Sequence, residues 1–206
     1  MLLKDKKTFP YAEELHEGYL ILGKDLNIIY SANKLSVSEI KHSISGTFQW
    51  QNNVCSILIK DGIPLGRTSS HKYTMNAPES LIARLIDGSL VYRSEDYLDN
   101  EKLKEYEWAV GGLGLVDYNP VKEGFVGKYS EVLDDIGHTG LGITHDDDIV
   151  CLYKKCSAAE FRDWAMNKLE LKYAIMLDSG TIAAINTGEK VINGNQKQNN
   201  ILQVIG

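Results

Sequence analysis

Arginine, proline and cysteine are scarce in this chain of 206 residues. There are four arginines, and 28 acidic residues outnumber 22 basic ones, so the formal net charge is −6. Proteins that bind duplex nucleic acid need a basic stripe, which this composition does not offer, so we expect no such partner. No Pro/Gly/Ser-rich linker or charge block divides the chain. We therefore expect one domain over residues 18–206, preceded by an N-terminal extension over residues 1–17.

The cysteines are too few and too irregularly placed to suggest a metal site. Cys55, Cys151 and Cys156 are odd in number and lack paired metal-ligand spacing. Cys151 lies in an apolar run, which favours a buried thiol in a reducing compartment. The acidic triplet at residues 146–148 lacks the alternating ligands, glycine and distal Glu of a calcium loop, so a solvated turn is favoured. We expect no metal and no cofactor.

Long hydrophobic runs are also missing. The first seven residues carry charges where a signal peptide would have its apolar stretch, and no segment approaches membrane-spanning length. We therefore expect a soluble protein with no membrane partner, cytoplasmic or, if the chain comes from a phage, virion-associated. The sequence carries no signal for oligomeric state.

The most ordered pattern begins with an apolar run of strand length at residues 149–153. Ser157 and Glu160 then form a capping-box pattern, which predicts a helix from Ala158. The apolar residues of this helix recur at spacings of three and four, as expected for a buried stripe: Phe161, Trp164, Ala165 and Leu169.

A second apolar run follows this helix and ends at Asp178. It predicts a strand covered on both faces, with a carboxylate at its carboxyl end beside a flexible Ser179–Gly180 turn. Ligands often bind at such strand ends, so Asp178 is the first candidate site residue. The alternative is that Asp178 only ends the strand by bonding the amides of the turn.

The first half of the chain has the pattern of antiparallel hairpins. Asp-Gly pairs at residues 61–62 and 87–88 stand between apolar runs, which is a strong hairpin signal, and residues 24–25 suggest another hairpin. Residues 111–116 indicate a glycine turn between two short strands rather than a cradle for phosphate. The fold class we expect is α+β, with a mixed, largely antiparallel sheet and a few packed helices.

The order of these segments resembles the phosphodiester glycosidase domain family, to which the uncovering enzyme N-acetylglucosamine-1-phosphodiester α-N-acetylglucosaminidase belongs. The family's Asn-Gly-Gly-Phe-Phe turn corresponds to residues 44–48, and its Lys-Asp-Gly hairpin to residues 57–62. Its Arg-Thr-Ala-x-Gly strand corresponds to residues 138–144, and its Asn-Leu-Asp-Gly-Gly-Gly-Ser motif to residues 175–181. The resemblance covers the chain from about residue 20 to its end.

Three motif positions differ from the family. Ser45 replaces an Asn, His138 replaces an Arg, and Ser179 replaces a Gly in a glycine run that is shorter by about a residue. The resemblance implies a single domain with that fold and one cleft at which the following residues converge: Ser45, Gly46, Thr47, His138, Thr139, Asp178, Ser179, Gly180 and Thr181.

The resemblance also implies a chemistry, the hydrolysis of a glycosyl-1-phosphodiester. An ionised Asp178 could stabilise the positive charge that builds at the anomeric carbon, or act as nucleophile or base. His138 could stabilise the departing phosphate if protonated, or act as an acid; a plain strand-edge role for it is equally open. The hydroxyl groups of Ser45, Thr47 and Thr139 would hold phosphate oxygens or sugar hydroxyls.

Other residues could add charge or stacking. Arg67, with His71, could contribute positive charge for a phosphate, while Arg84 has an equally good role on a solvated sheet face. Trp50 is the best candidate for stacking on a sugar or a base. Two functions follow: an enzyme that recognises and hydrolyses a phosphorylated sugar or nucleotide ligand, or a non-catalytic binder that sequesters such a signal or serves as a phage adhesion module.

Overall fold

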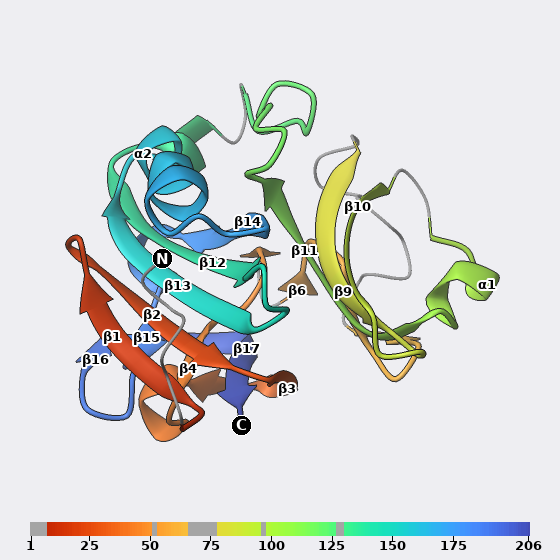
Figure 1. Ribbon diagram of the computed structural model, residues 1–206, viewed down its shortest axis with the longest axis horizontal. Helices are drawn as coiled ribbons and strands as arrows, with labels where there is room; N and C mark the ends of the chain where they lie inside the picture. The colour runs from red at the N-terminus through yellow and green to blue at the C-terminus, as the bar shows by residue number, and fades with distance from the viewer. Residues whose placement is uncertain (1–7, 51–52, 66–77, 96–97, 127–129) are drawn as a thin grey trace.

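The computed structural model describes residues 8–50, 53–65, 78–95, 98–126 and 130–206. Strands make up 51% and helices 14% of the structure, arranged as a β-rich sandwich (Figure 1). The α+β class expected from the sequence is therefore wrong. The physical reason is that the helical segments are short: the helix after Ser157 continues only to Lys168, and the segment after Ser36 forms only a single 3-10 turn, η1 (Val37–Glu39).

The larger sheet has ten strands, and every pairing within the described residues is antiparallel. Its main path runs in the order β1 (Tyr11–Leu15), β2 (Gly18–Gly23), β13 (Ile149–Cys156), β12 (Ile136–Ile143), β14 (Tyr173–Ser179), β11 (Tyr106–Gly114), β7 (Leu58–Lys60) and β8 (Ile63–Pro64). β9 (Glu79–Leu85) pairs with β11 and with β10 (Leu90–Glu95).

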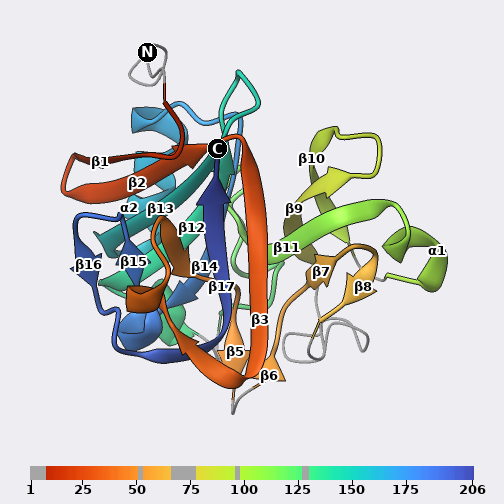
Figure 2. The same ribbon diagram turned by 90° about the horizontal axis from the view of Figure 1, so that it is seen from below.

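The second sheet lies against one face of the first (Figure 2). Its order is β16 (Val191–Ile192), β15 (Ile185–Asn186), β4 (Ser43–Ser45), β17 (Lys197–Ile205) and β3 (Asp25–Ser36), and a separate two-stranded ribbon joins β5 (Gln49–Trp50) to β6 (Asn53–Val54). Short helical segments complete the fold: α1 (Asn100–Leu103), η3 (Ser130–Leu133), α2 (Ala158–Asp163), the π-helical η4 (Trp164–Lys168) and η5 (Gly180–Ile182).

Two apolar layers cover the larger sheet. Between the sheets, Leu141 and Leu177 pack in one cluster with Ile44 and Leu202 of the second sheet. On the outer face, α2 and η4 contribute Phe161 and Trp164 to another cluster that also contains Met176. The alternation of Met176 and Leu177 between the two clusters explains why β14 is apolar on both faces, as its sequence predicts.

The local signals around α2 are confirmed. Ser157 Oγ accepts a hydrogen bond from the Glu160 amide, and the Glu160 carboxylate accepts one from the Ser157 amide, which completes a capping box. The hairpins at residues 61–62 and 87–88 are present as the pairs β7–β8 and β9–β10. Part of the segment expected as an N-terminal extension forms β1, which pairs with β2.

Two expectations for the first half are wrong. Residues 24–25 form no hairpin, because β2 belongs to the larger sheet and β3 to the smaller one, so the chain crosses between sheets there. Residues 111–114 form no turn but continue β11. The glycines of this strand let neighbouring side chains come close to its backbone, since a Cβ at Gly111 would lie 2.4 Å from Glu79 Oε1 and one at Gly114 2.3 Å from Ser80 Oγ.

Among the described residues, no helix is long and apolar enough to span a membrane.

Candidate functional site

Three chain segments meet where β14 ends. β12 and β14 pair at Gly140 and Met176 and again at His138 and Ser179, so β14 holds one extra residue in a β-bulge just before Ser179. At the bulge the Asp178 amide donates a hydrogen bond of 3.3 Å to the Gly46 carbonyl. The segments around residues 46, 138 and 178 are thus adjacent in the structure.

The Asp178 carboxyl group is the most unusual group at this end of the sheet. Asp178 is 6% exposed, and its Oδ1 accepts a hydrogen bond of 2.9 Å from the Ser179 amide. Its buried Oδ2 has no hydrogen-bond partner among the described residues. Burial raises the pKa of Asp178 to about 8, although the amides of Ser179 and Gln49 partly oppose the shift. The group is therefore mostly protonated at neutral pH, not ionised as the sequence suggests.

The His138 ring is engaged by the protein itself. His138 is fully buried, with Nε2 3.1 Å from the Asp134 carbonyl oxygen and Nδ1 2.9 Å from Ser179 Oγ. Since a carbonyl only accepts, Nε2 carries the proton and Nδ1 accepts from the Ser179 hydroxyl. Burial lowers the pKa of His138 below its ordinary value, so the imidazole stays neutral. This environment opposes a cationic role in holding phosphate and favours a role in orienting Ser179.

The three predicted hydroxyl ligands also bond within the protein. Ser45 Oγ accepts a hydrogen bond of 2.7 Å from the Ala184 amide, Thr47 Oγ1 donates one of 2.5 Å to the Gly111 carbonyl, and Thr139 Oγ1 donates one of 3.0 Å to the Asp178 carbonyl. All three side chains are fully buried. These hydroxyl groups hold the converging segments together.

The accessible rim of this end of β14 is the turn that follows it. Ser179 and Gly180 are half-buried and Thr181 is exposed. Gly180 has a φ of +78°, a left-handed conformation that glycine adopts without strain. The Ser179 amide bonds the Asp178 carboxyl group, and Gly180 and Thr181 follow it in the turn.

The remaining predicted contacts fall elsewhere. Arg67 and His71 lie outside the described residues, as does the side chain of Trp50. Arg84 donates a hydrogen bond of 2.8 Å to the Lys24 carbonyl and lies 3.3 Å from the Asp25 carboxylate, where the two sheets are joined. Both contacts of Arg84 are therefore structural, and neither leaves it at the Asp178 site.

Two residues at the site were missed in the sequence. The Gln49 amide contacts the Asp178 carboxyl group, and Asn200 bonds the backbone of segment 46–47. Asn199 and Asn200 are buried amides directly before the apolar residues Ile201 and Leu202 of the last strand, and this polar pair was the available signal.

Two acidic side chains of the turn at residues 146–148 form ion pairs. Across the described ranges, no three His, Cys, Asp or Glu side chains are grouped so that they could hold a metal. In the acidic turn, Asp147 pairs with Lys172 at 2.8 Å, and the buried Asp148 pairs with Lys24. Only part of that turn is solvated.

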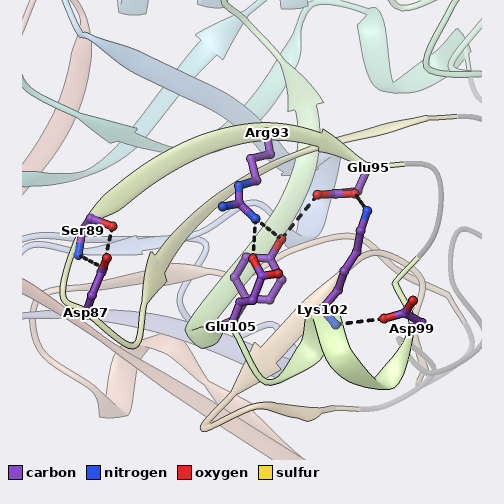
Figure 3. Close-up of polar contacts among 8 residues, drawn as sticks. Asp87, Ser89, Arg93, Glu95, Asp99, Lys102 and Glu105 are labelled. Carbon is purple, nitrogen blue, oxygen red and sulfur yellow. Dashed lines mark hydrogen bonds and ion pairs between the residues drawn. The ribbon is translucent and has the colours of Figure 1, made fainter.

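The β9–β10–α1 lobe has its own polar network (Figure 3). Arg93 Nη1 lies 2.9 Å from the Glu105 carboxylate, and Lys102 Nζ lies 2.5 Å from that of Glu95. The buried Tyr106 hydroxyl joins the network at 3.4 Å from Arg93. Because both cations have carboxylate partners, we assign this network to the stability of the lobe.

The sequence matches no protein-family model and no curated protein. Its fold is similar to the catalytic domain of zebrafish N-acetylglucosamine-1-phosphodiester α-N-acetylglucosaminidase, auto-inhibited by its pro-peptide, with a TM-score of 0.69 and 13% identity over 92% of this chain and 76% of that one. It is also similar to a hypothetical protein from Synechocystis (TM-score 0.62, 9% identity, 94% and 60% coverage). A third similar structure is a Burkholderia pseudomallei protein described as exported (0.61, 11%, 92% and 74%). The resemblance found in the sequence is thus confirmed at the level of fold.

Proposed function

We propose that this chain recognises and hydrolyses a glycosyl-1-phosphodiester, or a related phosphorylated sugar or nucleotide, at the carboxyl end of β14. The observation that carries the proposal is the buried Asp178 Oδ2, which has no hydrogen-bond partner among the described residues. A buried polar atom without a partner is costly, and such costs are characteristic of functional sites. The fold similarity to a domain named for a sugar phosphodiester supports the choice of substrate class.

A protonated carboxyl group suits an anionic guest. An ionised Asp178 would repel a phosphodiester, whereas the neutral form donates one hydrogen bond to a phosphate oxygen without repulsion. Its pKa of about 8 lies close to neutral pH, where a carboxyl group is effective as a general acid. The neutral state therefore serves both binding and proton transfer.

The hydrolytic step follows from these properties. The bond between the anomeric carbon and the bridging phosphate oxygen breaks, and the electron pair leaves with the phosphate. Asp178 passes its proton to that oxygen as the positive charge develops on the sugar ring; water adds to the anomeric carbon and loses a proton to solvent, from which Asp178 is reprotonated. The Ser179 amide bonds the Asp178 carboxyl group, and we assign the contacts to the phosphate or the sugar hydroxyls to the turn formed by Ser179, Gly180 and Thr181.

A second candidate is a non-catalytic binder of the same ligand class. It is favoured because the predicted ligand contacts already form hydrogen bonds within the protein: Ser45, Thr47, Thr139 and His138. Such a protein would keep the recognition by Asp178 and the rim while lacking the further groups that catalysis needs. We also propose, from the composition of the sequence, that neither duplex nucleic acid nor a membrane is a partner. We further propose that the chain acts in the cytoplasm or on a virion.

Turnover and binding assays on two variants separate these functions. The methyl phosphodiester of N-acetylglucosamine-1-phosphate and a uridine diphosphate sugar serve as probes, with sugar release and calorimetric binding measured in parallel. If Asp178 is the acid, Asp178→Asn keeps a donor and binds nearly as well as the wild type, while turnover falls by about 10²–10⁴-fold. Binding without sugar release in the wild type supports the binder. Full turnover in Asp178→Asn, or no binding of any probe, overturns the proposal.

A further inference from the structure

The Asp178 site depends on the short segment of residues 46–49, which connects β4 to β5. Residues 46–49 leave β4, pass the end of β14 and enter β5. Gly46 supplies the carbonyl that accepts the Asp178 amide, and Gln49 supplies an amide that favours the ionised form of the Asp178 carboxyl group. The contacts of Asp178 with Gly46 and Gln49 therefore both depend on the position of segment 46–49.

Asn200 holds this segment with three hydrogen bonds. Its Oδ1 accepts from the Thr47 amide at 2.7 Å, its Nδ2 donates to the Thr47 carbonyl at 3.1 Å, and its backbone carbonyl accepts from the Gly46 amide at 3.1 Å. Asn200 and Thr47 are both almost completely buried. Water cannot readily replace these bonds.

The chemistry of the carboxamide explains why an asparagine occupies this position. One side chain must both accept from and donate to the backbone of Thr47, and a carboxylate or a hydroxyl group cannot match both at this reach. Gly46 leaves the space for it, since a Cβ there would lie 1.8 Å from Asn200 Oδ1. Asn200 and Gly46 thus form one fitted contact.

We propose that Asn200 is a positioning residue for the Asp178 site: it fixes segment 46–49 so that Gly46 and Gln49 are presented to Asp178. Its importance for a substrate rests on the proposed function. Its effect on Asp178 does not, because the ionisation of Asp178 can be followed in the free protein.

The test compares two variants of Asn200 with a matched control. Asn200→Ala removes both side-chain bonds to Thr47, and the milder Asn200→Ser keeps a hydroxyl group that can satisfy one of them. The control is Asn186→Ala, because Asn186 is equally buried in the same sheet and bonds the carbonyls of Val37 and Ser38 at 3.1 and 3.2 Å, outside segment 46–49. Folding is checked by circular dichroism, and the pKa of Asp178 is measured by carbon-13 NMR of its carboxyl carbon.

The positioning role predicts an upward displacement of the Asp178 titration midpoint by about one pH unit in Asn200→Ala, because the Gln49 amide moves away from the carboxyl group. A smaller displacement in the same direction is expected in Asn200→Ser, which decides the matter if the alanine variant does not fold. Asn186→Ala should lower the melting temperature without moving the midpoint. An unchanged midpoint in the folded Asn200 variants, or an equal displacement in the control, overturns the proposal. Failure of the probes to bind would leave this result unaffected and would count only against the proposed function.

Discussion

Asp178 is expected to destabilise the folded protein at neutral pH, and Asp178→Asn should therefore stabilise it. Burial raises the pKa of the carboxyl group from an ordinary 3.8 to about 8, so the unfolded chain releases this proton at a much lower pH than the folded one. A group that binds its proton more tightly in the folded state lowers the free energy of unfolding as the pH rises from 3.8 towards 8. At pH 7 the loss amounts to about 4 kcal/mol relative to pH 3.

Urea unfolding of the wild type and of Asp178→Asn, followed by tryptophan fluorescence, measures this effect. At pH 4 the two free energies of unfolding should differ by less than about 1 kcal/mol, and at pH 8 the variant should be more stable by roughly 4–5 kcal/mol. The gain should grow steadily between these two pH values. A difference that is independent of pH, or a variant that is less stable at pH 8, would refute the reasoning.

An exposed carboxyl group gives a control of opposite sign. Hydrogen bonds from Ser89 lower the pKa of Asp87, so Asp87 contributes stability above pH 3.8 that is lost as the pH falls. Asp87→Asn should thus be slightly less stable than the wild type at pH 7 and equal to it in strong acid. The two variants together separate the effect of burial from a general effect of removing negative charge.

Three further predictions concern the framework of the site. Ser157→Ala removes the capping box with Glu160 and should lower the free energy of unfolding by about 1 kcal/mol in urea titrations, whereas an unchanged midpoint would mean that the cap is not needed. Gly46→Ala forces a Cβ against Asn200 and should cost about 1–3 kcal/mol, measured in the same way; a neutral variant would show that the contact yields easily. The Cys151 thiol is fully buried and its pKa is raised, so it should react with a disulfide reagent only after unfolding, and rapid labelling of the native protein would contradict its position.

Some parts of this fold could be predicted because their signals are local. The capping box at Ser157, the helical spacing of Phe161 and Trp164 and the apolar run before Asp178 each specify their own element, and all three are confirmed. The α+β class was wrong because a capping pattern such as that at Ser157 shows where a helix begins but not how long the helix becomes.

The properties of the site depend on contacts between distant residues. Thr47 and Asn200 are 153 residues apart, and Asp178 is kept neutral by its burial in the folded protein. The resemblance to the family in motif order implied that Gly46, His138 and Asp178 lie close together. It could not show that the His138 ring is held by Ser179 and Asp134, because a motif position does not specify hydrogen-bond partners.

The measurement that tests the central claim most directly is a crystal structure of the full chain grown with the methyl phosphodiester of N-acetylglucosamine-1-phosphate. The account predicts a phosphate or glycosidic oxygen of the ligand within hydrogen-bond distance of Asp178 Oδ2, with Ser179, Gly180 and Thr181 around it. A ligand bound at another part of the surface, with Asp178 Oδ2 still buried and without a partner as in the free protein, would contradict it.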